Sequence, residues 1–568
     1  MNKQWVIQET PDPSLVTTLQ ESLHIGQHLA GLLVQRGISN YDEAKAFFRP
    51  ELTDSHDPFD MKNMSIAVER LTQAIFNNEK ILIYGDYDVD GTTSVALVYS
   101  FLKTFSSNLF TYIPDRYTEG YGVSMKAMDW AIEHRMDLII TLDCGIRAVQ
   151  TISHAAANHI DTIICDHHLP GPVLPPAVAI LDPKQPDCDY PYEELSGCGI
   201  GYKLMEAFSI QNGIDENQLL QFLDLVAVSI ASDIVPITGE NRTLAFFGLK
   251  KLNSHPVPGL SALITKAGLK TPLTISNVVF GIGPRINAAG RISHADAALD
   301  LLTQNSLEAA KVFAEKLNLE NEERKSYDES ITKEALDLIA KGDPNNNTTV
   351  LFKKDWHKGI IGIVASRCIE HYYRPTIILT ESNNLITGSA RSIEGFNVYA
   401  AIEACSEHLE QFGGHKYAAG LTMKKSQLKK FKETFEQKVS EVIKPEDKIE
   451  KVLIDMELSL DEISPKFNSI LKQMGPFGPG NMQPVFVSRG VTLHTAPRVL
   501  KEKHLKLAIK QNGSMVFDAI GFGMSSYEEL VSAPFDIIYT IEENHFRGET
   551  TLQLMIKDLR VCEKTNLN

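Results

Sequence analysis

Short apolar runs alternate with segments of helical periodicity through the first half of the chain. The runs at residues 81–86, 137–145 and 161–168 are apolar and β-rich, which is typical of buried strands. Around them, apolar residues recur at helical spacing in residues 67–78, 92–105, 149–159, 197–208 and 219–236. Alternating strands and helices predict an α/β domain with a parallel sheet, which we expect over residues 61–300.

Three further regions complete the expected multidomain α/β architecture. Residues 301–342 contain one long, highly charged helical segment, which we expect to be a solvated bridge between domains. A second α/β domain is predicted over residues 343–445, and it ends in a lysine-rich helix at residues 424–442 whose charged face we expect to be solvated. Residues 1–60 are predicted to form a short helical N-terminal region.

The last part of the chain, residues 446–568, changes to alternation of apolar and polar positions. The alternation is clearest in residues 504–510, 515–522, 535–543 and 549–561. A period of two is typical of strands with one buried face. We therefore predict an antiparallel meander that closes into a small β-barrel.

Length and composition limit the class of protein. A chain of 568 residues with 43% hydrophobic residues fits three or four domains with full cores. We find no apolar run of about 18 residues and no signal peptide, so we expect a cytoplasmic protein without membrane association. Seven scattered cysteines with no C-x-x-C pair argue against a disulfide framework or a zinc ribbon. The net charge of −17 disfavours nucleic acid as a partner only weakly, because a local groove can still be basic.

Three aspartates, Asp86, Asp88 and Asp90, alternate directly after the first predicted strand and are followed by Gly91. This is the opening of an EF-hand loop, but the twelfth position is Leu97 instead of a bidentate Glu, and a strand precedes the loop where a helix is required. Alternate residues of an extended chain share one face, so three carboxylates repel one another unless cations or protons intervene. The pattern therefore predicts a metal site at the carboxyl end of a strand.

Two more predicted strands end in residues of the same chemical kind. Asp143 follows one strand and His167-His168 follow the next, while Asp233 ends an apolar helix. A single Asp after a strand is usually a helix cap or turn residue, and paired histidines are usually surface or core residues. Ligands bind at the carboxyl ends of parallel strands, so three such ends together favour a metal centre. Carboxylates and imidazoles without thiolates suit Mn²⁺ or Mg²⁺, and the set is large enough for two cations with one bridging carboxylate.

A second cluster of chemistry lies in the predicted second domain. Arg391 and Ser389 stand among small residues in GSARS, and Gly413-Gly414-His415 lets backbone amides approach a ligand closely. The guanidinium fork of arginine matches phosphate bidentately. The alternative for each arginine alone is a surface ion pair.

These motifs together resemble a known family. GDYDVDG, LDCG, CDHH and SDIVP resemble the four motifs of the DHH phosphoesterases, with Asp166-His167-His168 as the triplet that gives the name. ENRTLAFFGL, GPRINAAGR, WHKGIIGIVASR, GSARS and FGGHKYAAG are similar to RecJ-type single-strand-specific exonucleases. The resemblance runs in the same order over roughly residues 60–560. It implies a DHH catalytic domain, a DHH-associated domain and a C-terminal OB-fold-like barrel.

The resemblance also implies roles for single residues. The ligands of two Mn²⁺ or Mg²⁺ ions would be Asp88, Asp90, Asp143, His167 and Asp233, with Asp143 as the bridge. His168 would face the scissile phosphate as a stabiliser or an acid, and Asp86 would be a ligand or a supporting residue. The 5′-terminal phosphate would be held by Arg116, Arg285, Asn287, Arg291, Ser389, Arg391, Gly413, Gly414 and His415.

The implied function is a metal-dependent 5′→3′ exonuclease that degrades single-stranded DNA to 5′-mononucleotides in DNA repair and recombination. Expected partners are single-stranded DNA, a helicase and a single-strand-binding protein, and a monomer is expected. The barrel would bind the strand through Lys501, Lys503, Lys506 and Lys510, with Phe517 or Phe522. A small-substrate DHH phosphodiesterase or pyrophosphatase is the first alternative, but it needs no barrel. A non-catalytic replication scaffold of the same fold is the second, and the complete ligand set counts against it.

Overall fold

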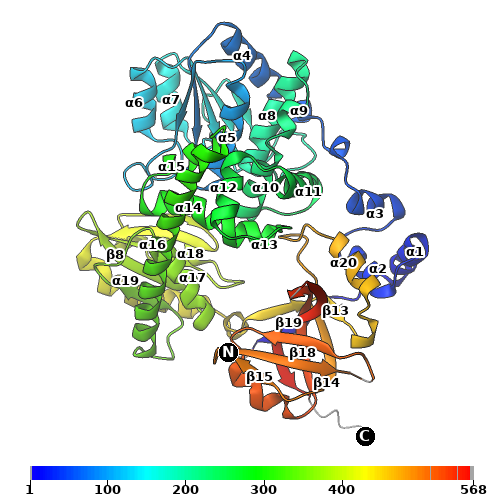
Figure 1. The fold of residues 1–568 in the computed structure, drawn as a ribbon. Coiled ribbons are helices and arrows are strands. Elements are labelled where there is room, and N and C mark those ends of the chain that lie inside the picture. Colours follow the sequence, from blue (N-terminus) through cyan, green and yellow to red (C-terminus); the bar gives the residue numbers. More distant parts are fainter. Residues whose placement is uncertain (1–2, 512, 547, 563–568) are drawn as a thin grey trace. The chain divides into compact units, whose positions relative to one another are not determined.

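The computed structural model describes residues 3–511, 513–546 and 548–562, arranged in two compact units (Figure 1). The first unit comprises Met1–Pro50, Ile449–Phe477 and Asn481–Asn568, and the second comprises Glu51–Lys448 and Gly478–Gly480. Parts of the predicted N-terminal region and barrel (residues 1–2, 512, 547 and 563–568) lie outside the described residues. In the described part of the chain, no helix has the length and apolarity that a bilayer span needs.

The second unit contains the predicted parallel sheet, which has five strands. Their order is β3 (Leu109–Tyr112), β2 (Ile81–Gly85), β4 (Leu138–Leu142), β5 (Asp161–Cys165) and β6 (Ala179–Leu181), and every pair is parallel. All residues of β2 and β4 are buried, which explains why these strands are continuously apolar in the sequence. The three predicted strands are thus adjacent in the sheet.

Helices cover both faces of this sheet (Figure 1). One face packs against α4 (Met64–Phe76), α5 (Val89–Leu102) and α8 (Gly197–Asn212), and the other against α6 (Met125–Glu133) and α7 (Val149–Ala157). The helix α5 begins earlier than the predicted residue 92. The reason is that the Asp88 side chain accepts the N–H of Gly91 and caps the helix.

The predicted helix at residues 219–236 is in fact two helices, α9 (Asn217–Leu220) and α10 (Leu223–Ser232). Asp233 is the C-cap of α10, and Ile234 has a left-handed φ of 62°, which ends the helix before the predicted limit. The connecting elements that follow are α11 (Gly239–Ser254), α12 (Pro258–Lys266), α13 (Ile275–Asn277), the π-helix η3 (Val278–Ile282), α14 (Gly283–Ile292) and α15 (Asp296–Leu302).

The predicted long helix is α16 (Leu307–Ala340), with 34 residues. It packs against α12, α14 and α15 and further along against α17 (Ile361–His371). Apolar Ala310, Ala314 and Leu317 are buried on it, and so are several polar residues. The expectation of a solvated bridge was therefore wrong for this face, because packing contacts run along much of the helix.

A second sheet of five strands follows α16. Its order is β10 (Gln411–His415), β11 (Ala418–Met423), β9 (Leu385–Arg391), β8 (Thr376–Ser382) and β7 (Thr349–Phe352), and only β7 and β8 run parallel. The lysine-rich helix is α19 (Leu428–Val442), and α18 (Val398–Glu403) lies beside it. Phe431, Phe435 and Val439 form the buried face of α19. Lys429 and Lys430 are exposed, as expected for a solvated face, whereas Lys432 is partly buried.

The first unit is built around a closed barrel of five strands. Their order is β14 (Phe486–Leu493), β18 (Phe535–Phe546), β19 (Glu549–Val561), β17 (Phe517–Gly521) and β16 (His504–Lys510), and β14 pairs with β16 to close the ring. The prediction of an antiparallel meander was wrong, because β17 and β19 pair in parallel. The smaller elements are β1 (Gln4–Ile7), α1 (Pro13–Leu23), α2 (Gln27–Gln35), α3 (Tyr41–Phe48), β12 (Lys451–Ile454), β13 (Met456–Glu457), α20 (Pro465–Gln473) and β15 (Arg498–Leu500).

Candidate metal centre and phosphate pocket

The carboxyl ends of β2, β4 and β5 meet at one edge of the parallel sheet. Asp86 follows β2, Asp143 follows β4, and Asp166-His167-His168 follows β5. Asp143 has a left-handed φ of 59°, an unusual backbone conformation for a residue other than glycine. The sheet topology alone therefore brings three separate motifs into contact.

His167 lies at the centre of the acidic residues and is almost completely buried. Its Nε2 atom is 3.1 Å from Oδ1 of Asp143, 3.6 Å from Oδ2 of Asp233 and 3.8 Å from Oδ2 of Asp90. Asp233 reaches this position from the end of α10, so a helix end completes a site that strand ends begin.

Three overlapping groups of side chains have the geometry to hold a cation, with ligand atoms within 4.8 Å of one another. Asp143 belongs to two groups, which fits the predicted bridge. All seven acidic and imidazole residues predicted for the site are brought together here, although their individual roles stay predictions. The groups are Asp86–Asp88–Asp143, Asp90–His167–Asp233 and Asp143–His167–His168.

The electrostatics of this cluster favour bound cations. Burial, and then repulsion from Asp90, raises the pKa of Asp143 well above its usual range, and the same causes raise that of Asp233 to about 8. Burial and the neighbouring Asp88 likewise raise the pKa of Asp86, and neither of its side-chain oxygens has a hydrogen-bond partner. Buried, unpartnered carboxylates are costly, and divalent cations with oxygen ligands would remove the cost. The residues present therefore fit Mn²⁺ or Mg²⁺.

Asp166 supports His168, a role that the sequence analysis does not predict for it. Its carboxylate accepts the backbone N–H groups of Ile146 and His167, and its Oδ1 lies 2.7 Å from Nδ1 of His168. Burial would lower the pKa of His168, but the contact with Asp166 outweighs burial and raises it to about 9. His168 is thus held by a buried anion while its ring is 44% exposed.

Tyr121 is a second residue that the sequence interpretation did not include. Its hydroxyl lies 2.9 Å from Nε2 of His168. The signal that could have found it is its position in YTEGYG, directly after the predicted phosphate ligand Arg116.

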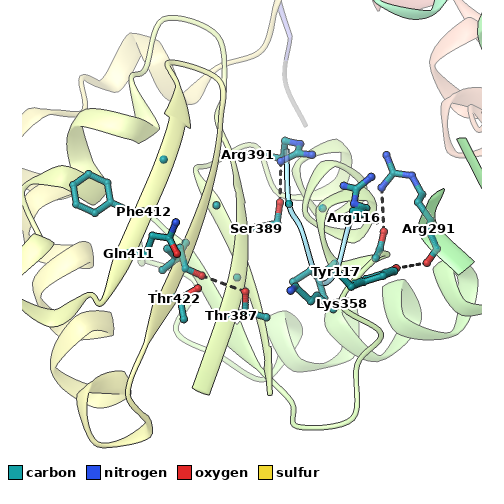
Figure 2. Close-up of a pocket in the computed structure, with 18 of the residues that line it drawn as sticks. Arg116, Tyr117, Arg291, Lys358, Thr387, Ser389, Arg391, Gln411, Phe412 and Thr422 are labelled. Atoms are coloured by element: carbon teal, nitrogen blue, oxygen red, sulfur yellow. Dashed lines mark hydrogen bonds between the residues drawn. The ribbon is translucent and has the colours of Figure 1, made fainter. Parts of the chain in front are cut away.

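Residues of both predicted α/β domains, which belong to the second unit, line a cavity of about 420 Å³ (Figure 2). Arg116 and Arg291 come from the first predicted domain, and Lys358 and Arg391 from the second. None of the lining residues, all within the described ranges, is an Asp or Glu. The cavity therefore collects four cations without an acidic neighbour in its wall, which suits a phosphate ligand.

Local contacts hold the arginines of this cavity in place. Arg391 stands at the end of β9, where Nη1 donates to Oγ of Ser389 at 3.0 Å and to the carbonyl of Ala390 at 2.8 Å (Figure 2). Arg291 donates from Nη1 to the carbonyl of Gly359 at 3.0 Å. Both arginines keep further donors for a ligand, because a guanidinium has five N–H groups.

The cavity adjoins the metal cluster through two short segments. Tyr87 lines the cavity and is flanked in sequence by Asp86 and Asp88, and the Arg116 guanidinium lies 4.9 Å from the centre of its ring. Gly120 also lines the cavity, and the next residue, Tyr121, contacts His168. A phosphate bound in the cavity would thus lie next to the segments that carry the carboxylates of the metal cluster.

Five of the nine predicted phosphate ligands line this cavity, namely Arg116, Arg291, Ser389, Arg391 and Gly413. Arg285 does not, because its guanidinium donates to Oδ1 of Asn318 and to the carbonyl of Gly281 and so ties α14 to α16. The remaining three, Asn287, Gly414 and His415, are not lining residues either. Gly414 shapes the β10–β11 hairpin instead, since a Cβ there would lie 2.3 Å from the carbonyl of Ala418. Lys358 also lines the cavity but is not among the predicted phosphate ligands, although it lies in the family motif WHKGIIG.

The barrel residues predicted to bind single-stranded DNA differ from one another in exposure. Phe517 is only 2% exposed and belongs to the barrel core, so its prediction as a stacking residue was wrong. Phe522 is 58% exposed and contacts the ring of His504. Lys506 pairs with Asp518 at 3.1 Å, whereas Lys501 and Lys503 lie exposed between β15 and β16.

Comparison with known proteins adds to this geometry. Three family models match in order: the DHH family N-terminal domain at residues 80–230, the DHHA1 domain at residues 345–441 and the RecJ OB domain at residues 454–558. The single-stranded-DNA-specific exonuclease RecJ of Bacillus subtilis is 36% identical over 566 residues, covering 98% of this chain and 71% of that protein. Its namesake in Escherichia coli is 32% identical over 517 residues, covering 87% of this chain and 89% of that protein.

Solved structures are similar as well. The crystal structure of RecJ in complex with Mn²⁺ from Thermus thermophilus superposes with a TM-score of 0.86 at 26% identity, covering 99% of this chain and 80% of that chain. A structure of exonuclease RecJ bound to manganese superposes with a TM-score of 0.61 at 30% identity, covering 68% of this chain and 97% of that chain.

Proposed function

Because this chain belongs to the family of RecJ single-stranded-DNA-specific exonucleases, we propose that it degrades single-stranded DNA from the 5′ end to 5′-mononucleotides. Mn²⁺ or Mg²⁺ is its cofactor. The main observation behind the proposal is that the acidic cluster and the cationic cavity adjoin each other. Tyr87 lines the cavity, and its sequence neighbours Asp86 and Asp88 belong to the cluster.

The acidic cluster would hold two divalent cations. Asp88, Asp90, Asp143, His167 and Asp233 are the proposed ligands, with Asp143 between the two ions and Asp86 as a ligand or a supporting residue. When bound, the cations supply positive charge at the scissile phosphate and make water acidic enough to serve as nucleophile at neutral pH. Asp86, Asp90 and Asp143 are buried, so this part of the site is shielded from bulk water.

We propose that His168 acts on the substrate itself. Its ring is partly exposed and Asp166 holds Nδ1, so Nε2, which lies 2.9 Å from the hydroxyl of Tyr121, is the atom that would face the scissile phosphate. The raised pKa of His168 favours the imidazolium, which can donate a hydrogen bond to a phosphate oxygen or a proton to the leaving 3′-oxygen.

The cationic cavity would determine the direction of digestion. Arg391, Arg291, Arg116 and Lys358 would bind the terminal 5′-phosphate, with the backbone of Gly413 open to the ligand. A strand anchored there by its 5′ end presents the next phosphate to the metal cluster. Each turnover would then release one 5′-mononucleotide.

The partners and setting follow family membership only. We infer a role in DNA repair and recombination, cooperation with a helicase and a single-strand-binding protein, a monomeric state and a cytoplasmic location. The two alternative functions are disfavoured by particular features. A small-substrate phosphodiesterase needs no OB domain, and a non-catalytic scaffold does not need a complete ligand set.

Digestion of long single strands tests the proposal. A 5′-labelled strand should release labelled mononucleotide from the start with Mn²⁺, whereas a 3′-labelled strand should shorten progressively. A blunt duplex should resist, and an Asp143→Asn variant should be inactive. Release of label from the 3′ end first would refute the polarity. Cleavage of only very short oligomers would favour the small-substrate enzyme, and no turnover would favour the scaffold.

A further inference from the structure

We propose that Gly197 and Ser229, which are not metal ligands, are positioning residues that set the spacing between the ligands Asp90, Asp143 and Asp233. Gly197 is the first residue of α8, and Ser229 lies in the last turn of α10. This inference rests on the metal centre of the proposed function and adds the residues that hold its ligands apart.

The N-terminus of α8 and Ser229 hold both oxygens of Asp90. Oδ2 accepts the N–H of Gly197 at 2.7 Å, and Oδ1 accepts the N–H of Cys198 at 2.8 Å. The hydroxyl of Ser229 lies 2.7 Å from Oδ1. Backbone N–H groups at a helix N-terminus favour an anion, so these contacts fix Asp90 as an oriented carboxylate in a buried place. The lone pairs that remain can point only in the directions that these donors leave open.

Because it has no side chain, Gly197 also allows the start of α8 to lie directly against Asp143. A Cβ at residue 197 would lie 2.6 Å from Cβ and 2.9 Å from Cα of Asp143, closer than real Cβ atoms approach. The Cα belongs to the backbone, which at Asp143 already has a left-handed φ of 59°. No flexible side chain can absorb such a contact. Gly197 thus donates a hydrogen bond to Asp90 and packs directly against Asp143, so it sets the distance between these two ligands.

Ser229 makes the equivalent connection between Asp90 and Asp233. Its hydroxyl contacts Asp90, and its backbone carbonyl accepts the N–H of Asp233 at 2.9 Å. The same hydroxyl lies 2.6 Å from Oγ of Ser196, the N-cap of α8. Two helices are therefore joined at the point where each of them contacts a metal ligand.

Each positioning residue connects a different pair of ligands: Gly197 connects Asp90 with Asp143, and Ser229 connects Asp90 with Asp233. Residues that orient metal ligands without binding the ion typically change metal affinity by about 10–100-fold when they are altered. A residue with a merely structural role would lower stability and leave the spacing of bound ions unchanged. The spacing of the ions is therefore the informative readout.

Gly197→Ala in the full chain tests the first connection. Mn²⁺ titration by calorimetry should show affinity about 10–100-fold weaker than in the unaltered protein. Two Mn²⁺ ions held close together also give an exchange-coupled electron paramagnetic resonance spectrum, and this coupling should weaken or disappear. The matched control is Gly199→Ala, two residues along the same helix, where a Cβ would meet only side-chain atoms at 3.4 Å or more. The control should bind and couple Mn²⁺ normally.

Ser229→Ala tests the second connection. Circular dichroism in EDTA shows whether Gly197→Ala folds, and if it does not, Ser229→Ala still tests the inference. It should fold and bind Mn²⁺ more weakly. Wild-type affinity, or unchanged coupling between the bound ions, in either variant would overturn the inference for that residue. An unaltered protein that binds no Mn²⁺ would refute the metal centre of the proposed function instead, so the two failures are distinguishable.

Discussion

Nδ1 of His168 lies 2.7 Å from Oδ1 of Asp166, and this carboxylate is buried and also accepts three backbone N–H groups. The contact fixes the orientation of the imidazole, so that Nε2 lies on the side of the ring away from Asp166. Burial alone would raise the pKa of Asp166, but the hydrogen bond and charge of His168, the N–H of Ile146 and the charge of His167 together outweigh burial and lower it. The pair is thus an oriented cation beside the proposed scissile phosphate.

Asp166→Asn should therefore lower the cleavage rate by about 10²-fold or more, the range that general acid catalysis contributes. The amide keeps the shape of the side chain but removes the anion that favours the imidazolium of His168. Single-turnover digestion of a 5′-phosphorylated strand at saturating Mn²⁺ measures the rate. The matched control is Asp129→Asn, which alters an exposed Asp–His pair with His154 at 2.9 Å. A wild-type rate in Asp166→Asn would show that His168 does not need this partner.

Metal binding should depend on pH because the cluster carboxylates hold protons in the metal-free protein. The pKa of Asp233 is raised to about 8 by burial and by Asp90 and Asp88, and those of Asp86 and Asp143 are raised as well. A carboxyl whose folded pKa is raised binds more protons in the folded state than in the unfolded state. The stability of the metal-free protein should therefore fall as the pH rises toward about 8.

Thermal unfolding in EDTA and in Mn²⁺ measures this linkage. The Tm in EDTA should decrease as the pH rises, and Mn²⁺ should remove most of the decrease because the cations replace the protons. Mn²⁺ binding should also release protons, which calorimetry in buffers of different ionisation enthalpy detects. A Tm in EDTA that rises over the same pH interval would contradict the raised pKa values of the cluster.

The preference for a 5′-phosphate should depend on Arg391. Arg391→Met keeps much of the side-chain length but removes the guanidinium from the cavity, so a strand with a 5′-phosphate should lose its advantage over a 5′-hydroxyl strand. The loss should be roughly 10-fold or more, since a hydrogen bond to a charged group contributes about 1.5–3 kcal/mol. Fluorescence anisotropy with both strands and metal-free protein measures the ratio of the two affinities.

Arg285→Met is the control for this change. The Arg285 guanidinium bonds to Asn318 and Gly281 outside the cavity, so this variant should lower stability and leave the ratio of affinities unchanged. If Arg285→Met abolishes the phosphate preference and Arg391→Met does not, the cavity has been assigned to the wrong arginine.

The strand ends could be predicted from the sequence because the pattern that marks them is local. Asp86, Asp143 and His167 each follow an apolar run, and parallel strands place their carboxyl ends together. The choice between Arg285 and Arg291 could not be made this way. Both lie on α14, about 120° apart around the helix, and distant residues decide which one faces the cavity. Asn318 of α16 holds one, and the carbonyl of Gly359 holds the other.

Supporting residues were the least predictable part of the site. Gly197 and Ser229 carry no group that marks them in a sequence, and their importance arises only from contacts with Asp90 across more than a hundred residues. The connectivity of the barrel was missed for a related reason. Alternation indicates strands but not their partners, so the parallel pairing of β17 with β19 could not be foreseen.

The two phenylalanines of the barrel should respond to alanine in opposite ways. Phe517→Ala removes a core side chain and should cost about 3–5 kcal/mol of unfolding free energy, visible as a lower Tm. Phe522→Ala removes an exposed ring and should leave the Tm nearly unchanged. Because stacking contributes about 1–3 kcal/mol per base, Phe522→Ala should weaken binding of a long single strand about 5- to 150-fold in anisotropy with metal-free protein. Unchanged binding in Phe522→Ala, with the exposed lysines Lys501 and Lys503 intact, would mean that the barrel does not use this ring to hold DNA.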